Sequence, residues 1–448
     1  MPARLGRAGT RPIGHAEGVD PSPSVAPREP TAPPSTPPPG SILRPAIVYA
    51  VLFGAAGAYL PYISIFLESV GLDLGSIGAL IGLYAAVSLV AAPSWGAVAD
   101  AVGDVRGPVL LAATLSALAI GLLAVAVSPL TIAIAVALLA ASYAGIIPMI
   151  DSQAVRLVGR RERFGVVRAP GSAAFVVSAF ATGAVIAVTG PRGMFLVDGA
   201  LTILIGVAAW LLLRAPTRTI GTGRSERRTS ASSVASRAVA GLSPATIVGI
   251  LRTPRYGPFF LALVLIWTSL AAIQGFISLR IVALGGDETL VAAAWSLGAL
   301  LEVFLMPAFP WFARRVGTER LIVIGTIAFA VRAVISAVTD EPVLIVLAAL
   351  GNGVGFTFVY VGVVTWVAAT VERRAQATAQ GIFTGTSNGL GTIGGAVVGG
   401  AIAGALGLQV LFAIAAVGYL GGGALAWFAI GRRAGRPAAT EDRSGSDR

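Results

Sequence analysis

The chain contains no cysteine and no lysine, and its single histidine, His15, lies in a polar stretch near the N-terminus. Without cysteine there can be no disulfide and no thiolate metal site. Without lysine there is no phosphate-binding GxxxxGK[ST] loop, so direct use of ATP is not expected. Histidine ordinarily titrates near neutral pH, so a proton bound in an apolar part of this chain must be carried by a carboxylate or a tyrosine.

Charged residues are also scarce. Only 12% of the 448 residues are charged while 56% are hydrophobic, and the mean hydropathy is +0.84. A soluble domain carries about 25% charged residues, so this composition predicts an integral membrane protein. No motif for a nucleophile, a metal or a cofactor is present. We therefore expect neither an enzyme nor a protein that holds a metal or a cofactor.

The net charge of +11 comes from 32 basic residues, all of them arginine. The arginines cluster in the two tails and in alternate turns between apolar stretches. The other turns hold mostly acids: Glu68, Asp73, Asp287, Glu288, Asp340 and Glu341, against Arg192 and Arg280. Basic residues concentrate on the cytoplasmic side of membrane proteins, so this asymmetry predicts that both termini are cytoplasmic. It indicates topology in a cell membrane, such as a bacterial inner membrane, and no nucleic-acid partner is expected.

Apolar stretches of spanning length fill most of the chain. There are twelve: 43–68, 76–99, 107–127, 130–155, 166–189, 194–214, 256–280, 289–313, 320–338, 342–371, 377–404 and 408–431. Most connections between them are short. The exception is a polar, arginine-rich linker after the sixth stretch, which divides the chain into two sets of six. The sequence thus predicts an all-α membrane protein with twelve transmembrane helices.

Five segments follow from this division. They are a disordered Pro/Arg-rich cytoplasmic tail (1–41), a six-helix bundle (42–214), a cytoplasmic linker (215–254), a second six-helix bundle (255–431) and a disordered cytoplasmic tail (432–448). A shift of 214 residues aligns Pro93 with Pro307 and Gly171 with Gly385 at equivalent places in the two bundles. Two pseudo-symmetric bundles of this kind are typical of carriers that work by alternating access and bind their substrate near the midplane.

Glu302 and Arg332 carry charges inside apolar stretches. Each lies fifteen residues from Gly317, the centre of the turn between their two stretches. At ~1.5 Å per residue, both side chains reach about 22 Å into a hydrocarbon core roughly 30 Å thick, so we expect them to face each other. A charge at this depth costs roughly 2.5–3.5 kcal/mol and usually marks an ion or substrate path. A proton carrier with its counter-charge and a permanent structural ion pair are both open interpretations.

The segment GAVADAVGDVR, Gly96 to Arg106, lies in the turn between the second and third stretches. Its Gly96, Asp100, Gly103 and Arg106 resemble the signature of the major facilitator superfamily, although Ala101 and Asp104 replace residues that are usually basic. The acid can pair with basic groups at this turn while the glycines let two spans approach closely. A second copy, PWFARRVGTER, keeps Gly317 and Arg320 but has Arg314 in place of the acid. An ordinary arginine-bearing turn is the alternative interpretation.

GAYLPYISIFLESVG (57–71) and PMIDSQAVRLVGRRERFGVVRAPGSAAF (148–175) resemble more specifically the group of lactose, phenylpropionate and nucleoside permeases. This resemblance implies the major facilitator fold over most of residues 43–431. It also implies that Asp151 and Arg168 bind substrate and that Glu302 and Arg332 serve proton coupling. From position alone, Asp151 and Arg168 can equally extend toward the lipid headgroups.

The tenth stretch departs from this group. It lacks the histidine and the glutamate that the lactose permease uses for proton coupling, and its central polar side chains are Asn352, Thr357 and Tyr360. A coupling relay of the lactose type is thus not supported. Together with Tyr59 in the first stretch, Asn352 and Tyr360 are our further candidates for substrate binding, and Glu302 is the best-placed carboxylate for a proton.

Several other residues have a structural interpretation at least as strong as a functional one. Asp198 is expected to be solvated at the end of the sixth stretch. The glycines between Gly381 and Gly404 recur at four-residue steps and indicate close helix packing. Five of the aromatic residues inside the spans can line a cavity, form interfacial belts or pack between helices. They are Tyr59, Tyr62, Trp267, Trp295 and Trp366.

We therefore predict a monomeric secondary transporter that moves a small organic solute by proton-coupled symport. Two arginines near the cavity favour a carboxylate such as an aromatic acid, and the resemblance also implies a nucleoside or a sugar. A drug or metabolite efflux antiporter and a non-transporting receptor or assembly factor on the same fold are the alternatives. Its partners are then the substrate, protons and the lipid bilayer.

Overall fold

The computed structural model describes residues 40–158, 164–214, 252, 256–371 and 376–431. The predicted linker and both predicted tails lie outside these residues, except for positions 40, 41 and 252. The described residues contain twelve helical spans long and apolar enough to cross a membrane. This number confirms the expectation from the sequence.

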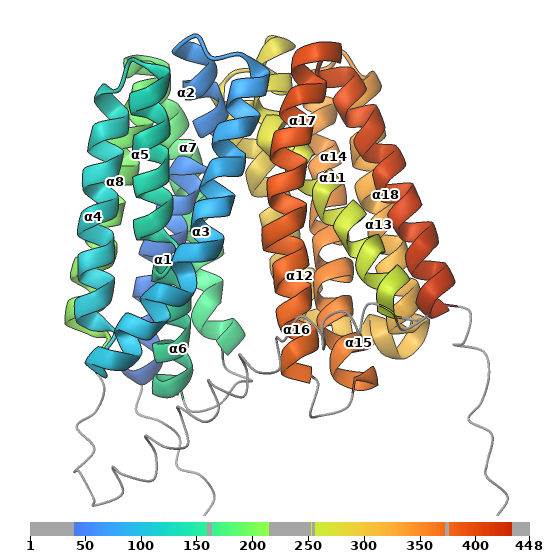
Figure 1. The fold of residues 1–448 in the computed structure, drawn as a ribbon, viewed down its shortest axis with the longest axis horizontal. Coiled ribbons are helices and arrows are strands. Elements are labelled where there is room, and N and C mark those ends of the chain that lie inside the picture. Colours follow the sequence, from blue (N-terminus) through green and yellow to red (C-terminus); the bar gives the residue numbers. More distant parts are fainter. Residues whose placement is uncertain (1–39, 159–163, 215–251, 253–255, 372–375, 432–448) are drawn as a thin grey trace, which may run out of the picture. The chain divides into compact units, whose positions relative to one another are not determined.

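The first six spans are formed by α1 (Gly40–Tyr59) with α2 (Ile63–Ser69), α3 (Leu74–Val102), α4 (Arg106–Val125), α5 (Pro129–Tyr143) with α6 (Ile146–Val158), α7 (Phe164–Thr189), and η2 (Pro191–Gly193) with α8 (Met194–Leu212). The last six are formed by α11 (Tyr256–Ala283), α12 (Glu288–Val316), α13 (Thr318–Val338), α14 (Pro342–Phe356) with η3 (Thr357–Val361) and α15 (Gly362–Thr370), α16 (Gln376–Thr384) with η4 (Gly385–Gly391) and α17 (Thr392–Leu406), and α18 (Leu408–Ile430). Figure 1 shows these helices running side by side.

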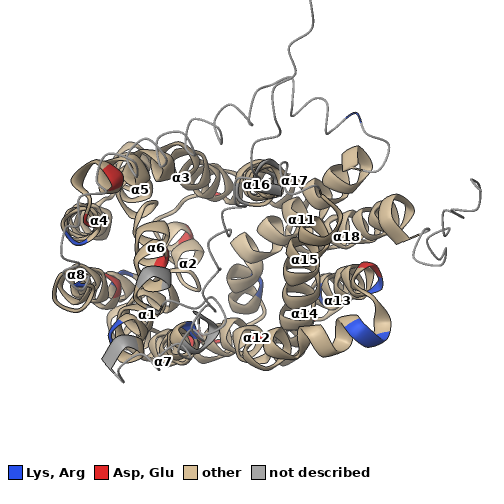
Figure 2. Cartoon of the chain, turned by 90° about the horizontal axis from the view of Figure 1, so that it is seen from below, with Lys and Arg blue, Asp and Glu red and all other residues tan. Residues whose placement is uncertain are grey.

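The two ends of the bundle differ in charge. We call one the acidic end. It contains the turns at Gly71, Gly285 and Gly407 and six acids: Glu68, Asp73, Asp287, Glu288, Asp340 and Glu341. The other, the arginine end, contains the turns at Gly103 and Gly317. Between the ends the helices carry few charged residues. Figure 2, which looks along the bundle, shows Arg, Asp and Glu as scattered segments of otherwise uncharged helices. An apolar mid-section with charged ends is typical of membrane-spanning helices, because charges are costly in the hydrocarbon core.

Some spans are broken near their middle. Pro61 separates α1 from α2, because proline lacks the N–H that a helix needs and its ring crowds the preceding turn. The tenth and eleventh spans instead contain π-helical segments, η3 and η4. Single π turns inside α-helices occur frequently at functional sites. All three breaks place irregular backbone at the depth of the cavities described below.

Glycines bring α3 and α17 into backbone contact near the acidic end. A Cβ built on Gly78 would lie 2.4 Å from the carbonyl oxygen of Ala396 and 2.6 Å from the Cα of Gly400. A Cβ on Gly400 would in turn lie 2.7 Å from the Cα of Gly78. No side chain fits there, so the contact requires glycine at both positions. We call this contact the glycine seam; it joins the second span to the eleventh.

Tyr62 makes a second link at the same end. Its ring is buried, and its hydroxyl lies 2.8 Å from the carbonyl oxygen of Ala179 in α7 and 3.2 Å from that of Glu288 in α12. The fifth and eighth spans are thereby tied through the corner between α1 and α2. Further toward the arginine end the same long helices are poorly covered: Val90 of α3 is 74% exposed and Phe304 of α12 is 72% exposed. These direct links between the first six and the last six spans therefore lie near the acidic end, whereas α3 and α12 are poorly covered toward the other end.

Candidate functional site: two adjoining cavities and the charges near them

A cavity of about 340 Å³ lies between the first six and the last six spans. Residues of α1, α2, α3 and α5 line one side, and residues of α11, α12, α14 and α17 line the other. We call it the central cavity. Its lining is mostly apolar and aromatic, with Ser64, Gln274 and Thr392 as polar members and no charged side chain among the residues the structure describes. Such a site suits a neutral ligand with a flat or apolar face.

Two tryptophans of the last six spans face this cavity. Trp295 is held in place because its indole N–H donates to the hydroxyl of Ser278, 3.0 Å away. Trp267 packs against Phe356 with their ring centroids 6.0 Å apart and nearly perpendicular. The hydrogen bond of Trp295 and the ring contacts of Trp267 restrict both side chains, so they form a preorganised surface. The possibility that Trp267 and Trp295 line a cavity is confirmed, whereas Tyr62 and Trp366 are buried in helix packing.

Tyr360 lies behind this surface. Its ring stacks on Phe356 at 5.2 Å and lies 5.7 Å from Phe383, but it does not line the central cavity. It belongs to η3, where the π turn starts directly after Phe356. Tyr360 supports the aromatic wall and is itself 40% exposed, so its contact with a substrate stays a prediction.

Tyr59 and Tyr84 line a second cavity as well as the central one. This side cavity, of about 240 Å³, extends among the first six spans and is also lined by Phe53, Tyr143 and Asp198. The rings of Tyr59 and Tyr84 lie 6.4 Å apart. Tyr59 thus lines both cavities, and its role in substrate binding stays a prediction. Asp198 is only 3% exposed, so the expectation that it is solvated was wrong: three tyrosines from other spans cover it.

Asp151 and Arg168 lie outside both linings. The Asp151 carboxylate accepts a hydrogen bond of 2.5 Å from the hydroxyl of Tyr49, which ties α6 to α1. The Arg168 guanidinium lies over the ring of Phe53 at 4.9 Å, and Phe53 lines the side cavity. Both charges act on the Tyr49 hydroxyl. The structure therefore gathers the two predicted residues around α1, next to the cavities rather than in them.

Glu302 does not pair with Arg332. The two side chains are both described, and no ion pair within 4.0 Å joins them, so the expectation that they face each other is wrong for this structure. The positive charge that acts on Glu302 is instead that of Arg168 in α7. Glu302 is half-buried on α12. A carboxylate of the eighth span thus lies in the field of an arginine of the fifth.

Arg332 has a different partner. Its Nη1 donates to the amide oxygen of Asn352 in α14 at 2.8 Å, and the side chain is only 6% exposed. Its Nε has no hydrogen-bond partner among the described residues. The predicted pairing fails because α13 packs mainly against α14 and α18 and makes few contacts with α12, which carries Glu302. The bond from Arg332 occupies the oxygen of Asn352, which does not line the central cavity.

The turn motifs at the arginine end make fewer contacts than the sequence suggested. A Cβ on Gly96 would meet nothing within 4 Å, so this glycine does not serve a close approach here. Gly103 ends α3 with a positive φ of 75°, which glycine adopts without strain. Arg106 pairs with Asp104 at 2.7 Å, the acid that stands where the family signature is usually basic.

Two of the other members of the turn motifs are exposed, and the third, Gly317, provides a backbone conformation that the turn requires. Asp100 is exposed and has no hydrogen bond or ion pair within the part of the chain that the structure describes. Gly317 joins α12 to α13 with a φ of 91°, and Arg320 is exposed. The looseness of this end, where α3 and α12 are poorly covered, explains why the predicted interhelical contacts are missing.

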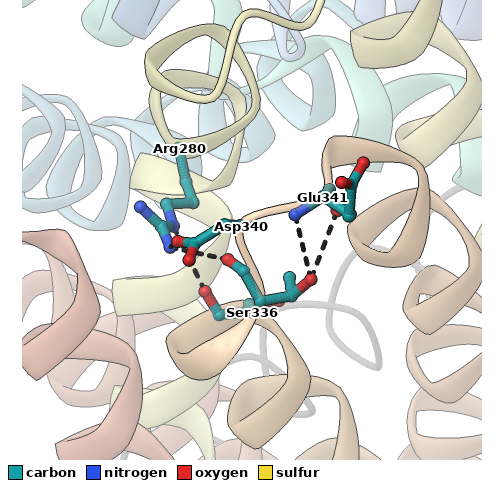
Figure 3. Close-up of polar contacts among 5 residues, drawn as sticks. Arg280, Ser336, Asp340 and Glu341 are labelled. Carbon is teal, nitrogen blue, oxygen red and sulfur yellow. Dashed lines mark hydrogen bonds and ion pairs between the residues drawn. The ribbon is translucent and has the colours of Figure 1, made fainter.

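Arg280 lies buried near the acidic end, where arginines are few (Figure 3). Its Nε donates to the carbonyl oxygen of Ser336 at 3.3 Å and its Nη2 to that of Thr339 at 2.8 Å, with the Asp340 carboxylate 3.8 Å away. These carbonyls end α13 and have no partner within that helix. Arg192 does the same for α4, donating to the carbonyl oxygens of Ala124 and Ala126. Both arginines are therefore helix caps.

Three of the lining residues were hard to identify as such from the sequence alone. Gln274 is a primary amide inside an otherwise apolar span, which could have marked it as a candidate. Tyr84 could not be distinguished from a packing residue, because helix rotation decides which face a tyrosine occupies. Asp198 was assigned by its distance from the helix end, which does not show what covers it.

Residues 42–414 match the family described as the MFS_1 like family. The maltose permease of Geobacillus stearothermophilus is 25% identical over 347 residues, which cover 77% of this chain and 83% of the permease. The crystal structure of the nucleoside transporter NupG superposes with a TM-score of 0.71 at 18% identity, covering 87% of this chain and 98% of that one. A peptide transporter, POT, crystallised with sulfate, superposes with a TM-score of 0.62 at 13% identity, covering 88% and 95%. The fold is common to all of them.

Proposed function

Because the chain belongs to the MFS_1 like family, whose members are multi-pass membrane transporters of the major facilitator superfamily and not enzymes, we propose that it is a proton-coupled symporter of a neutral, hydroxylated solute, a sugar or a nucleoside. The lining of the central cavity carries this proposal. It combines aromatic rings with the amide of Gln274 and the hydroxyls of Ser64 and Thr392, and it contains no charged side chain in the described chain.

Neutral sugars and nucleosides suit such a lining. Their rings present apolar faces that pack on tryptophan and tyrosine, while their hydroxyls need neutral donors and acceptors. A carboxylate in the same place would lose its hydration without gaining a counter-charge, which is costly. Arg168 and Arg332 do not line the cavity. The structure therefore supports an aromatic acid as substrate less strongly than the sequence did. The similarity to a maltose permease favours a sugar.

Glu302 is proposed as the proton carrier. It lies on α12, and the arginine that acts on it, Arg168, lies on α7. In the two-bundle organisation that the sequence predicts, these helices belong to different bundles, so rocking of the bundles changes the distance between the two charges. Proton binding at Glu302 is then linked to conformation. Arg332 remains a proposed counter-charge only for a conformation in which it leaves Asn352.

The direction of transport follows from the proposed orientation. If both termini are cytoplasmic, the arginine end faces the cytoplasm and the acidic end faces outward. The glycine seam and Tyr62 then close the outer side of the central cavity. The structure corresponds to an inward-facing state under this proposal, in which substrate is released to the cytoplasm.

The test of the proton assignment uses purified protein in proteoliposomes. We expect Glu302→Gln to abolish uptake driven by an inward proton gradient while it retains exchange of labelled for unlabelled substrate, because exchange needs no net proton movement. Glu68→Gln, at an exposed position of the acidic end, is the matched control and should behave as wild type. Unchanged gradient-driven uptake in Glu302→Gln would refute the assignment. Substrate efflux under the same gradient would identify an antiporter instead.

The substrate class is tested separately by binding. Sugars and nucleosides are screened for quenching of the fluorescence of Trp267 and Trp295, which line the cavity. Gln274→Ala should weaken binding of the solute that quenches by about 5- to 150-fold, as expected for loss of about 1–3 kcal/mol of buried hydrogen bonding. Binding of an aromatic carboxylate but of no sugar or nucleoside would contradict the proposed class.

A further inference from the structure

Asp198 is the one charged side chain that lines either of the two cavities, among the residues that the structure describes. It lies in α8, five residues after η2, and is 3% exposed. The rest of the side cavity is apolar or aromatic. The function proposed above makes no use of this carboxylate.

The groups that surround Asp198 are neutral. Tyr59 of α1, Tyr84 of α3 and Tyr143 of α5 line the cavity with it, and Asp198 acts electrostatically on all three. Its polar neighbour on α8 itself is Thr202, one helical turn further along. Each packed element that contributes a titratable group to this cavity therefore contributes a phenol, and none contributes a cation.

The arginines on elements packed against α8 do not pair with Asp198. Arg44 of α1 is exposed near the start of that helix. Arg192 of η2 binds the carbonyl oxygens at the end of α4. Arg106 of α4 lies over the ring of Trp210, and Arg168 of α7 lies over that of Phe53. No ion pair between an arginine and Asp198 is present within the described residues. An ionised carboxylate at this place would lack both water and a counter-charge, which costs far more than keeping it neutral.

The side cavity borders the space that a substrate would occupy. Tyr59, Leu60 and Tyr84 line both cavities. A solute in the central cavity would therefore touch two of the rings that cover Asp198. Water entering the central cavity has the same short route to the carboxylate.

We propose that Asp198 is a proton-binding site of its own, separate from Glu302 and loaded and emptied through the central cavity. The carboxyl group takes up a proton from cavity water and becomes neutral, and it returns the proton to water when it ionises; no other bond changes. This places one protonatable carboxyl among the first six spans and one, Glu302, among the last six. The inference rests on the burial and lining of Asp198 and stands whether or not Glu302 drives transport.

Infrared difference spectroscopy tests the site without substrate. Spectra of the purified protein at about pH 6 and about pH 9 are subtracted; exposed aspartates, which titrate near 3.9, stay ionised across this range and do not contribute. We expect the C=O band of a protonated carboxyl group in the wild type, the loss of one component in Asp198→Asn, and retention of that component in Glu302→Gln. A difference spectrum of Asp198→Asn identical to that of the wild type would overturn the proposal.

Isotope labelling keeps the test informative if Asp198→Asn does not fold. Wild-type protein grown with ¹³C-labelled aspartate should show the band component shifted to lower frequency, which assigns it to an aspartate. Asp151→Asn, which changes the other aspartate that is at least partly buried inside the spans, should keep the shifted component; Asp100 of α3 is exposed. If the labelled wild type shows no shifted component, no aspartate titrates in this range and the proposal is wrong. Loss of the shifted component in Asp151→Asn would likewise overturn it.

Discussion

The guanidinium of Arg332 donates a hydrogen bond of 2.8 Å to the amide oxygen of Asn352, and not to the carboxylate of Glu302. The bond joins α13 to α14 in a buried part of the last six spans. A Cβ on Gly298 of α12 would lie 3.3 Å from the Asn352 amide nitrogen, so three helices meet at this side chain. The bond to Asn352 thus offsets part of the free-energy cost of burying the positive charge of Arg332.

Replacing Asn352 should destabilise the protein. Asn352→Leu removes the acceptor at similar volume and leaves the Arg332 charge buried without it, at a cost of roughly 1.5–3 kcal/mol. We expect a lower midpoint of thermal unfolding in detergent. Asn352→Asp restores an acceptor and adds a counter-charge, so its midpoint should equal or exceed that of the wild type. Equal midpoints for Asn352→Leu and wild type would mean that the bond contributes nothing.

The glycine seam should control the closure of the acidic end. Gly78→Ala places a methyl group 2.4 Å from the Ala396 oxygen, and overpacking of this kind costs about 1–3 kcal/mol. The closed population should fall by about 5- to 150-fold relative to the open one. The chain has no cysteine, so spin labels at Ser76→Cys and Leu406→Cys report the distance between α3 and α17 without interference.

Gly96→Ala is the matched control for that experiment. It lies on the same helix, α3, but its Cβ would meet nothing within 4 Å. The distribution of label distances should therefore move to longer values in Gly78→Ala and stay as in the wild type in Gly96→Ala. The same shift in both variants would show that helix propensity, and not the contact, is responsible.

Arg280 should contribute stability and not transport. Arg280→Ala leaves the carbonyl oxygens of Ser336 and Thr339 without a donor inside the protein, so we expect a lower unfolding midpoint. Arg280→Lys should recover part of the loss, since one ammonium cannot reach both carbonyls as a planar guanidinium does. Arg314→Ala removes an exposed arginine and is the control. A midpoint equal to that of the control would contradict the capping role.

Asp73 gives a pH dependence with a defined sign. It begins α3, where its carboxylate accepts from the backbone N–H of Ser76 at 3.0 Å and from the Ser76 hydroxyl at 2.7 Å. The Ser76 hydroxyl bond, followed by the backbone bond, lowers the carboxyl pKa below its ordinary value of 3.8. A lowered pKa in the folded state means that the charged cap stabilises the protein above the unfolded pKa, and this stabilisation is lost as the pH falls through the folded value.

Thermal unfolding of wild type and Asp73→Asn over a pH series measures this effect. The wild type should be the more stable at neutral pH, and the difference should shrink as the pH falls below about 4. Glu68→Gln, also at the acidic end and exposed, serves as the comparison without a helix cap. A difference that grows in acid would reverse the assigned sign.

The spans themselves were predictable because an apolar run of about 20 residues has the length and composition of a helix that crosses the hydrocarbon core. The predicted stretch 408–431 differs by one residue from α18, which ends at Ile430. Membership of the major facilitator superfamily, expected from short motifs, is confirmed by the match over residues 42–414. The break at Pro61 follows from proline chemistry, whereas η3 and η4 have no comparable local signature.

Side-chain partners were less predictable because they depend on helix rotation. Counting from Gly317 gives the depth of Arg332 but not the face of α13 that carries it, and that face meets α14. The same applies to Asp198. Its position in the sequence gives its distance from a turn, but does not show that Tyr59, Tyr84 and Tyr143 of three other spans line a cavity with it. A single sequence does not specify these long-range contacts.

The glycine seam also bears on how fast the acidic end can open and close. Gly78 and Gly400 touch through backbone atoms and have no side-chain rotamers to order each time the surfaces meet, so closure loses little conformational entropy at this contact. Its attraction is dispersion between neutral atoms, which is weak for each pair and unaffected by ionic strength. The rate of opening at this contact should therefore be insensitive to salt.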